Sequence, residues 1–179
     1  MSSQDAVGAT REAITSLAAD PNRRRARHLA LAWADQRSGE SRILVTTSFD
    51  GGVHWSRAVD VSDGPPGMVD QRDHPEIGFA PDGRLLVVWR DHRCCGGDWS
   101  SAYQIFARAM RVGAHGPMAM GRRVQVTNRP QQPNSSNLLD EYLGMTVGPE
   151  GLSVAWNQPR AGVATTYFRR IPLSAFNGR

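Results

Sequence analysis

The sequence contains no lysine: all 21 of its basic residues are arginines, against 17 acidic residues. The formal charge of +4 therefore rests on guanidinium groups, which stay protonated at physiological pH and favour planar anionic partners such as carboxylates. The arginines are scattered along the chain and do not form one stripe with interleaved aromatic residues, as is typical of nucleic-acid-binding proteins. We therefore expect no nucleic-acid partner.

Long hydrophobic runs are also lacking. No run approaches the roughly 20 apolar residues of a membrane-spanning helix, and the first eight residues lack the basic and then apolar layout of a signal peptide. We expect a soluble chain with no membrane partner, whose compartment the sequence leaves open. With 40% hydrophobic and 21% charged residues, the composition is that of a globular protein and excludes disordered and collagenous classes.

Cysteine is nearly absent, and the only two cysteines, Cys94 and Cys95, are neighbours. Adjacent residues are too close for ordinary disulfide geometry, so we expect either two free thiols in a reducing compartment or a local exception to that geometry. A zinc site that added His92 would still lack four ligands from separated segments. The sequence therefore predicts no metal site and no cofactor.

What the chain does contain is an internal repeat centred on Trp33, Trp89 and Trp156. In each copy an apolar run ends in the tryptophan and an arginine follows four residues later, which predicts equivalent buried positions. Turn signals and further β-rich segments flank each run. The expected strands cover 14–18, 28–33, 42–47 and 58–62, then 76–79, 84–89, 103–110 and 124–128, then 142–147, 151–156 and 165–171.

Four antiparallel strands per unit at a repeating period predict an all-β fold made of β-propeller blades. The blades are expected at about 11–64, 70–130 and 138–179, within a single region that covers 1–179. Residues 11–19 would also pass alone as a short helix, because they are rich in good helix formers, but the repeat favours a strand. The arginines that recur after the tryptophans are expected to brace neighbouring blades.

The loop after the third expected strand carries Ser48, Asp50, Gly52 and Trp55 in the pattern Ser-x-Asp-x-Gly-x-x-Trp. An Asp in such a loop can accept backbone N–H bonds, Gly permits a positive φ, and Trp packs over the turn. The pattern resembles the Asp-box, or bacterial neuraminidase repeat, of the sialidase superfamily. The resemblance implies a six-bladed β-propeller, of which about three four-stranded blades are visible here. We expect this box to be structural.

Residues that enter the innermost strand of each blade should face the central channel of a propeller. In the sialidase family three arginines hold the substrate carboxylate, an Asp is the acid/base, and a Tyr paired with a Glu is the nucleophile. The resemblance makes Asp73, Glu141 and Tyr142 candidate catalytic residues. These side chains could equally form structural salt bridges in a wet channel.

The candidate ligand-binding residues come from the same entries and from one further motif. The entries contribute Arg11, Arg72 and His74. Arg170 belongs to an Arg-Ile-Pro sequence that resembles the carboxylate-binding element of sialidases, although it follows the recognisable blades.

The expected function is recognition of a glycan or another anionic ligand in the propeller channel, and the sequence leaves open whether hydrolysis occurs. The alternatives are an exo-α-sialidase, which is a glycoside hydrolase, and a propeller scaffold that binds proteins. The third copy lacks a fourth strand, which Val7–Thr10 of the same chain or, as we expect, of a neighbouring chain could supply. This arrangement predicts a homodimer that completes the propeller.

Overall fold

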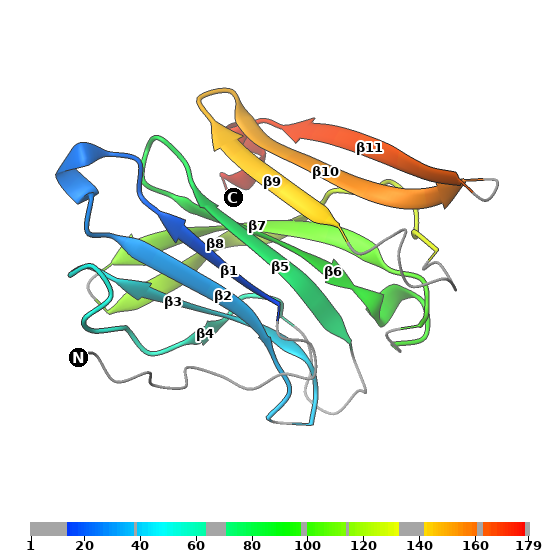
Figure 1. Ribbon diagram of the computed structural model, residues 1–179, viewed down its shortest axis with the longest axis horizontal. Helices are drawn as coiled ribbons and strands as arrows, with labels where there is room; N and C mark the ends of the chain where they lie inside the picture. Colours follow the sequence, from blue (N-terminus) through cyan, green and yellow to red (C-terminus); the bar gives the residue numbers. More distant parts are fainter. Residues whose placement is uncertain are drawn as a thin grey trace.

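The computed structural model describes residues 14–37, 39–63, 71–97, 100–113, 115–132, 142–160 and 163–177. These residues form antiparallel β-sheets and short 3-10 helices, which confirms the predicted all-β class (Figure 1). The described part of the chain has no helix that is long and apolar enough to cross a membrane.

Three sheets follow one another along the chain, with strand orders β1-β2-β3-β4, β5-β6-β7-β8 and β9-β10-β11. The strands are β1 (Thr15–Ala19), β2 (Leu29–Asp35), β3 (Arg42–Ser48), β4 (Val59–Asp60), β5 (Arg72–Phe79), β6 (Leu85–Asp91), β7 (Gln104–Gly113), β8 (Gly116–Gln125), β9 (Leu143–Gly148), β10 (Gly151–Arg160) and β11 (Val163–Ile171). The 3-10 helices are η1 (Arg23–Arg25), η2 (His92–Cys94) and η3 (Leu173–Phe176).

The first strands of the three sheets lie side by side, with β5 between β1 and β9 (Figure 1). The second sheet packs against its neighbours through both faces. Val87 and Trp89 of β6 belong to the apolar core shared with the first sheet, whereas Leu86 and Val88 belong to the core shared with the third. Burial on both faces explains why β6 reads as a continuous apolar run.

The three repeat tryptophans occupy equivalent places in their sheets. Trp33, Trp89 and Trp156 are at most 8% exposed. Their partners on the third strand of each sheet are Leu44, Phe106 and Tyr167. The predicted equivalence and burial of the tryptophans are therefore confirmed.

Arginine side chains join neighbouring sheets at equivalent positions. Arg108, on the third strand of the second sheet, donates from Nη1 to the carbonyl of Val61 in the first sheet, at 3.2 Å. Arg169, at the same position of the third sheet, donates from Nη1 to the carbonyl of Val126 in the second, at 2.5 Å. The two interfaces between sheets thus share one polar contact as well as an apolar core.

A second brace comes from the arginine that follows the tryptophan. Arg93 pairs with Asp91 in its own sheet and donates to the carbonyls of Ser62 and Asp63 in the first sheet. The predicted brace between neighbouring units is confirmed at Arg93. The side chain of Arg160 lies outside the described residues.

The fourth strand of the second sheet differs in extent from the prediction. Instead of covering 124–128, β8 begins at Gly116 and ends at Gln125. Gly113 and Gly116 face each other at a tight hairpin turn, where Gly116 has a φ of 110°. Glycine tolerates this backbone conformation, so the chain returns directly along β7.

The prediction of two free thiols is wrong, because Cys94 and Cys95 are joined by a disulfide. The bond lies in the turn that follows β6. At Cys95 the backbone has φ −145° and ψ 27°, which is neither helical nor extended. With this backbone conformation the two adjacent cysteines form a bond that the sequence did not predict. Because both sulfur atoms are in the disulfide, neither is a thiolate that could bind zinc together with His92.

The loop between β3 and β4 has the hydrogen bonds expected from its pattern. The Asp50 carboxylate accepts from the backbone N–H of His54 at 2.9 Å, and the Ser48 hydroxyl accepts from the N–H of Gly52 at 2.9 Å. Gly52 has a φ of 91° and lies beside the Trp55 indole. The His54 backbone N–H and imidazole hold the pKa of the Asp50 carboxyl below its ordinary value.

Replacing Asp50 with alanine should lower the melting temperature by about 2–4 °C, since the loop loses its carboxylate acceptor. Thermal unfolding at pH 7 would measure the change. Because the pKa of Asp50 is lowered on folding, its contribution is present at neutral pH and fades on acidification. Val53→Ala, at a 69% exposed position of the same loop, is the control and should melt as the parent does. An unchanged melting temperature for Asp50→Ala would show that the carboxylate does not stabilise the loop.

Candidate functional site

The candidate residues Arg72, Asp73 and His74 begin β5, the first strand of the second sheet, and all three are buried. Arg72 donates from Nη1 to the carbonyl of Ser41 at 2.9 Å, and the Ser41 hydroxyl donates back to the carbonyl of Arg72. Arg72 therefore ties the second sheet to the first.

Asp73 is the centre of a buried ionic cluster. Its carboxylate lies 2.6 Å from Nε of Arg90, 3.1 Å from Nδ1 of His74 and 3.3 Å from Nε2 of His92. Burial alone would raise the pKa of Asp73, but Arg90 and the two histidines outweigh burial and hold that pKa well below its ordinary value. Asp73 is therefore a carboxylate at neutral pH.

Backbone and ring contacts fix the cluster in place. The pairing of β5 with β6 shifts register between Asp73 and Glu76, and His74 within this bulge has a φ of 48°. Tyr103, directly before β7, packs against the cluster. The Arg90 guanidinium lies 4.9 Å from the centre of the Tyr103 ring, and the centres of the His92 and Tyr103 rings are 5.4 Å apart. Arg90, His92 and Tyr103 were not expected at this site, because they belong to other strands and loops.

The buried cluster is suited to holding the fold together and not to acid catalysis. A general acid needs a pKa near the working pH, whereas the pKa of Asp73 is lowered. Charged groups that are buried and paired in this way are common structural elements. The geometry favours the alternative reading of these residues as internal salt bridges.

The other candidate residues do not join the cluster. Tyr142 precedes β9 and is 70% exposed, and no hydrogen bond joins it to Asp73 in the described structure. Arg170, on the edge strand β11, pairs with Glu150 at 2.5 Å. Arg11 and Glu141 lie outside the described residues.

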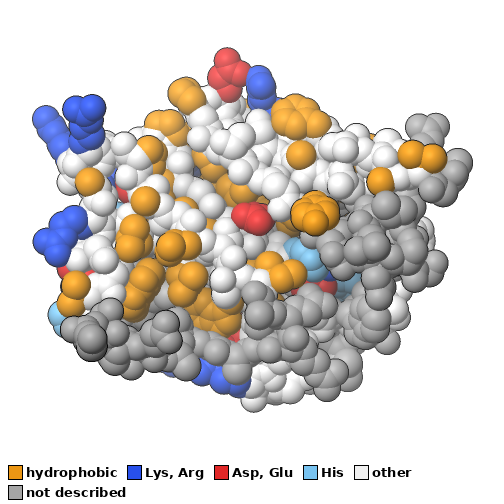
Figure 2. Space-filling model, viewed as in Figure 1, with side chains coloured by type: hydrophobic (Ala, Val, Ile, Leu, Met, Phe, Trp, Pro, Cys, Tyr) orange, Lys and Arg blue, Asp and Glu red, His pale blue; other side chains and the backbone are white. Residues whose placement is uncertain are grey.

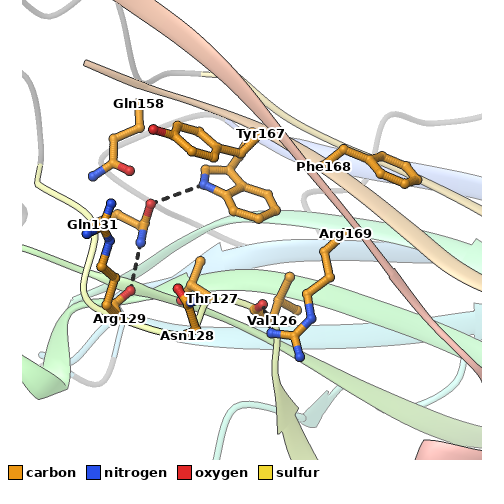
Figure 3. Close-up of a pocket in the computed structure, with 10 residues that line it drawn as sticks. Val126, Thr127, Asn128, Arg129, Gln131, Gln158, Tyr167, Phe168 and Arg169 are labelled. Atoms are coloured by element: carbon orange, nitrogen blue, oxygen red, sulfur yellow. Dashed lines mark hydrogen bonds between the residues drawn. The ribbon is translucent and has the colours of Figure 1, made fainter. Parts of the chain in front are cut away.

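An open pocket of about 420 Å³ lies between the second and third sheets (Figure 3). Its walls come from the segment after β8 and from β10 and β11. The lining residues are Val126, Thr127, Asn128, Arg129, Gln131, Trp156, Gln158, Tyr167, Phe168 and Arg169. They combine two arginines with amides and aromatic rings, and no carboxylate occurs among the described residues of the lining.

Hydrogen bonds order one wall of this pocket. The Trp156 indole N–H donates to Oε1 of Gln131 at 3.2 Å, and the Gln131 amide donates to the carbonyl of Arg129 at 2.7 Å (Figure 3). The rings of Trp156 and Tyr167 are stacked, with centroids 5.8 Å apart. The aromatic and amide surfaces are therefore held before any ligand arrives.

The equivalent place between the first and second sheets is filled by the protein itself. There the Arg123 guanidinium lies 4.3 Å above the Phe106 ring and 3.3 Å from the carboxylate of Asp91. In the repeat, Tyr167 takes the position of Phe106, and the neutral Gln158 takes that of Asp91. Among the described residues, the pocket therefore has neither the acid nor the covering arginine of its counterpart.

The sequence contains a signal for this pocket that the repeat alignment could have revealed. Phe106 and Tyr167 are each followed two residues later by an arginine that contacts the preceding sheet, Arg108 or Arg169. After β7 the chain continues into β8, which carries Arg123, whereas no such strand is paired with β11 in the described residues.

On the face in Figure 2, basic side chains lie in separate groups. Positive charge on that face is therefore local.

No protein-family model matches the chain, and comparison with curated proteins finds no match. The sialidase resemblance therefore rests on the residues of the repeat and of the loop between β3 and β4.

Proposed function

We propose that the chain is a portion of a sialidase-like β-propeller that recognises an acidic carbohydrate, or a similar anionic ring compound, without hydrolysing it. The observation that carries this proposal is the lining of the pocket between the second and third sheets, where Arg129 and Arg169 lie near aromatic rings and amides. The volume of about 420 Å³ is in the range of small-molecule sites.

The lining matches the chemistry of a carboxylated sugar. A guanidinium binds a carboxylate through charge-assisted hydrogen bonds, and an aromatic ring such as Tyr167 packs against the apolar face of a sugar. Amides such as those of Asn128 and Gln158 can bond hydroxyl groups. Arg169 uses one nitrogen on the carbonyl of Val126, and a guanidinium carries five N–H donors in all.

Consecutive sheets, adjacent first strands and repeated braces support the propeller architecture. The loop from Ser48 to Trp55 supports the sialidase-like type. Hydrolysis is the less favoured alternative, because Asp73 is buried with a lowered pKa. A fluorogenic sialoside assay would test it directly.

Arg129→Gln should weaken binding of an acidic sugar about tenfold or more, since a charge-assisted hydrogen bond contributes about 1.5–3 kcal/mol. Isothermal titration with N-acetylneuraminic acid, glucuronic acid and methyl glucoside would measure the affinities. The acids should bind more tightly than the neutral sugar, and added salt should weaken their binding.

Arg122→Gln is the matched control, because Arg122 is an exposed arginine of β8 that does not line the pocket. It should bind like the parent. Equal affinities for acidic and neutral sugars, or equal losses in both variants, would contradict the proposed site. Failure of every sugar to bind would favour the protein-binding scaffold.

A further inference from the structure

Within the part of the chain that the structure describes, no fourth strand covers the outer edge of the third sheet. In the described structure β11 pairs only with β10, whereas β3 and β7, at the same position, are each covered by a fourth strand. An uncovered edge presents a row of backbone N–H and C=O groups that can pair with another extended segment. The edge of β11 is therefore a docking surface for a strand.

The fourth strands of the first two sheets, β4 and β8, show which sequence pattern pairs with a third strand. Val59–Ser62 and Val124–Thr127 share the pattern Val-x-Val-(Ser/Thr). In each segment the N–H of the third residue donates to a carbonyl of the neighbouring strand, and the hydroxyl of the fourth residue accepts from the N–H of the same partner. These partners are Ile43 and Ile105, and Thr166 is their equivalent on β11.

A similar segment, Val7–Thr10, reads Val-Gly-Ala-Thr, with Ala in place of the second Val, and lies outside the described residues. If the third position accepts Val or Ala, the pattern occurs three times in the chain, and the other two occurrences are the existing fourth strands. We propose that Val7–Thr10 of a second copy of this chain adds to β11 as its fourth strand. In this register the Ala9 N–H donates to the Thr166 carbonyl, and the Thr10 hydroxyl accepts from the Thr166 N–H.

The length of chain between Thr10 and β1 decides whether the segment comes from the same chain or from a second copy. Five residues from Thr10 to the start of β1 at Thr15 span at most about 17 Å. The empty position beside β11 is three strand spacings from β9, and β9 is separated from β1 by β5. With about 4.8 Å per strand and about 10 Å per sheet, the distance is roughly 25 Å. Each copy therefore gives its segment to the other, which closes a two-fold dimer.

The docked strand leaves the pocket between the second and third sheets open. Gly8 would lie opposite Tyr167, as Gln125 lies opposite Phe106. Because glycine has no side chain, the dimer keeps the lining described above. Dimer formation and ligand binding can therefore be tested separately.

Sedimentation equilibrium of the intact chain at about 50 µM should show a dimer that dissociates on dilution. Ala9→Pro removes the N–H that reaches Thr166 and should give a monomer. Gly8→Pro is the matched control: its N–H faces away from β11, where a strand tolerates proline, so this variant should remain a dimer.

A synthetic peptide of residues 5–12 provides an independent test. Added in excess to the parent dimer, the peptide should occupy β11 and shift the chain to monomer, whereas the same peptide with Ala9→Pro should not. A monomeric parent chain, a dimer that persists in Ala9→Pro, or an equal effect of both peptides would overturn the proposal.

Discussion

Replacing Trp89 with alanine should lower the free energy of unfolding by about 3–5 kcal/mol, the usual effect of deleting a large core aromatic. Trp89 is fully buried between the first and second sheets, and its ring stacks on Phe106 with centroids 6.2 Å apart. The loss is a large fraction of the 5–15 kcal/mol that typically holds a domain together. Urea unfolding followed by circular dichroism would measure it.

Two variants keep this test informative. Trp89→Phe retains a ring and should be destabilised less than the alanine variant. Leu17→Ala changes a side chain that is 64% exposed, so its unfolding midpoint should stay within about 0.5 kcal/mol of the parent. An alanine variant of Trp89 as stable as the Leu17 control would refute the alignment of the three tryptophans.

Replacing Asp73 with asparagine should have a comparable effect, about 3–5 kcal/mol, because it removes one charge of a buried ion pair, 2.6 Å from the Arg90 guanidinium. Asp82→Asn is the matched control. Asp82 also pairs with an arginine, Arg84, but its side chain is 45% exposed, so its loss should cost less than about 1 kcal/mol.

The Asp73 prediction includes a pH dependence. The pKa of Asp73 is lower in the folded chain than the value of about 3.9 in the unfolded chain, so its stabilisation is fully present above that value. The difference in unfolding free energy between the parent and Asp73→Asn should shrink below about pH 4, as the carboxyl group takes up a proton. A difference that grows on acidification would contradict the lowered pKa.

Local patterns predicted much of the fold. The apolar runs ending in tryptophan and the intervening turn residues identified strands in all three sheets, because period and turn chemistry are properties of neighbouring residues. The extent of β8 was missed, since the hairpin at Gly113 and Gly116 carries no strong turn pair. The disulfide was missed because it depends on one local bend.

The candidate site was less predictable, because it depends on residues that are distant in sequence. The sequence identified Asp73 but could not show that Arg90 and His92 lie against its carboxylate. Nor could it distinguish a channel wall from a buried cluster, because the same residue types serve both. In the described residues the open pocket differs from the corresponding place in the preceding repeat by Gln158 in place of Asp91 and by having no equivalent of Arg123.

The strictly sequential order of the strands has a consequence for synthesis. Each strand pairs with the one just before or after it in the chain, so each sheet can assemble from hairpins soon after it leaves the ribosome. Packing between sheets comes later, because Leu86 and Val88 of the second sheet belong to the apolar core shared with the third. A nascent chain that has reached the end of β8 therefore exposes an apolar sheet face, and a pause in translation at that point should recruit chaperones.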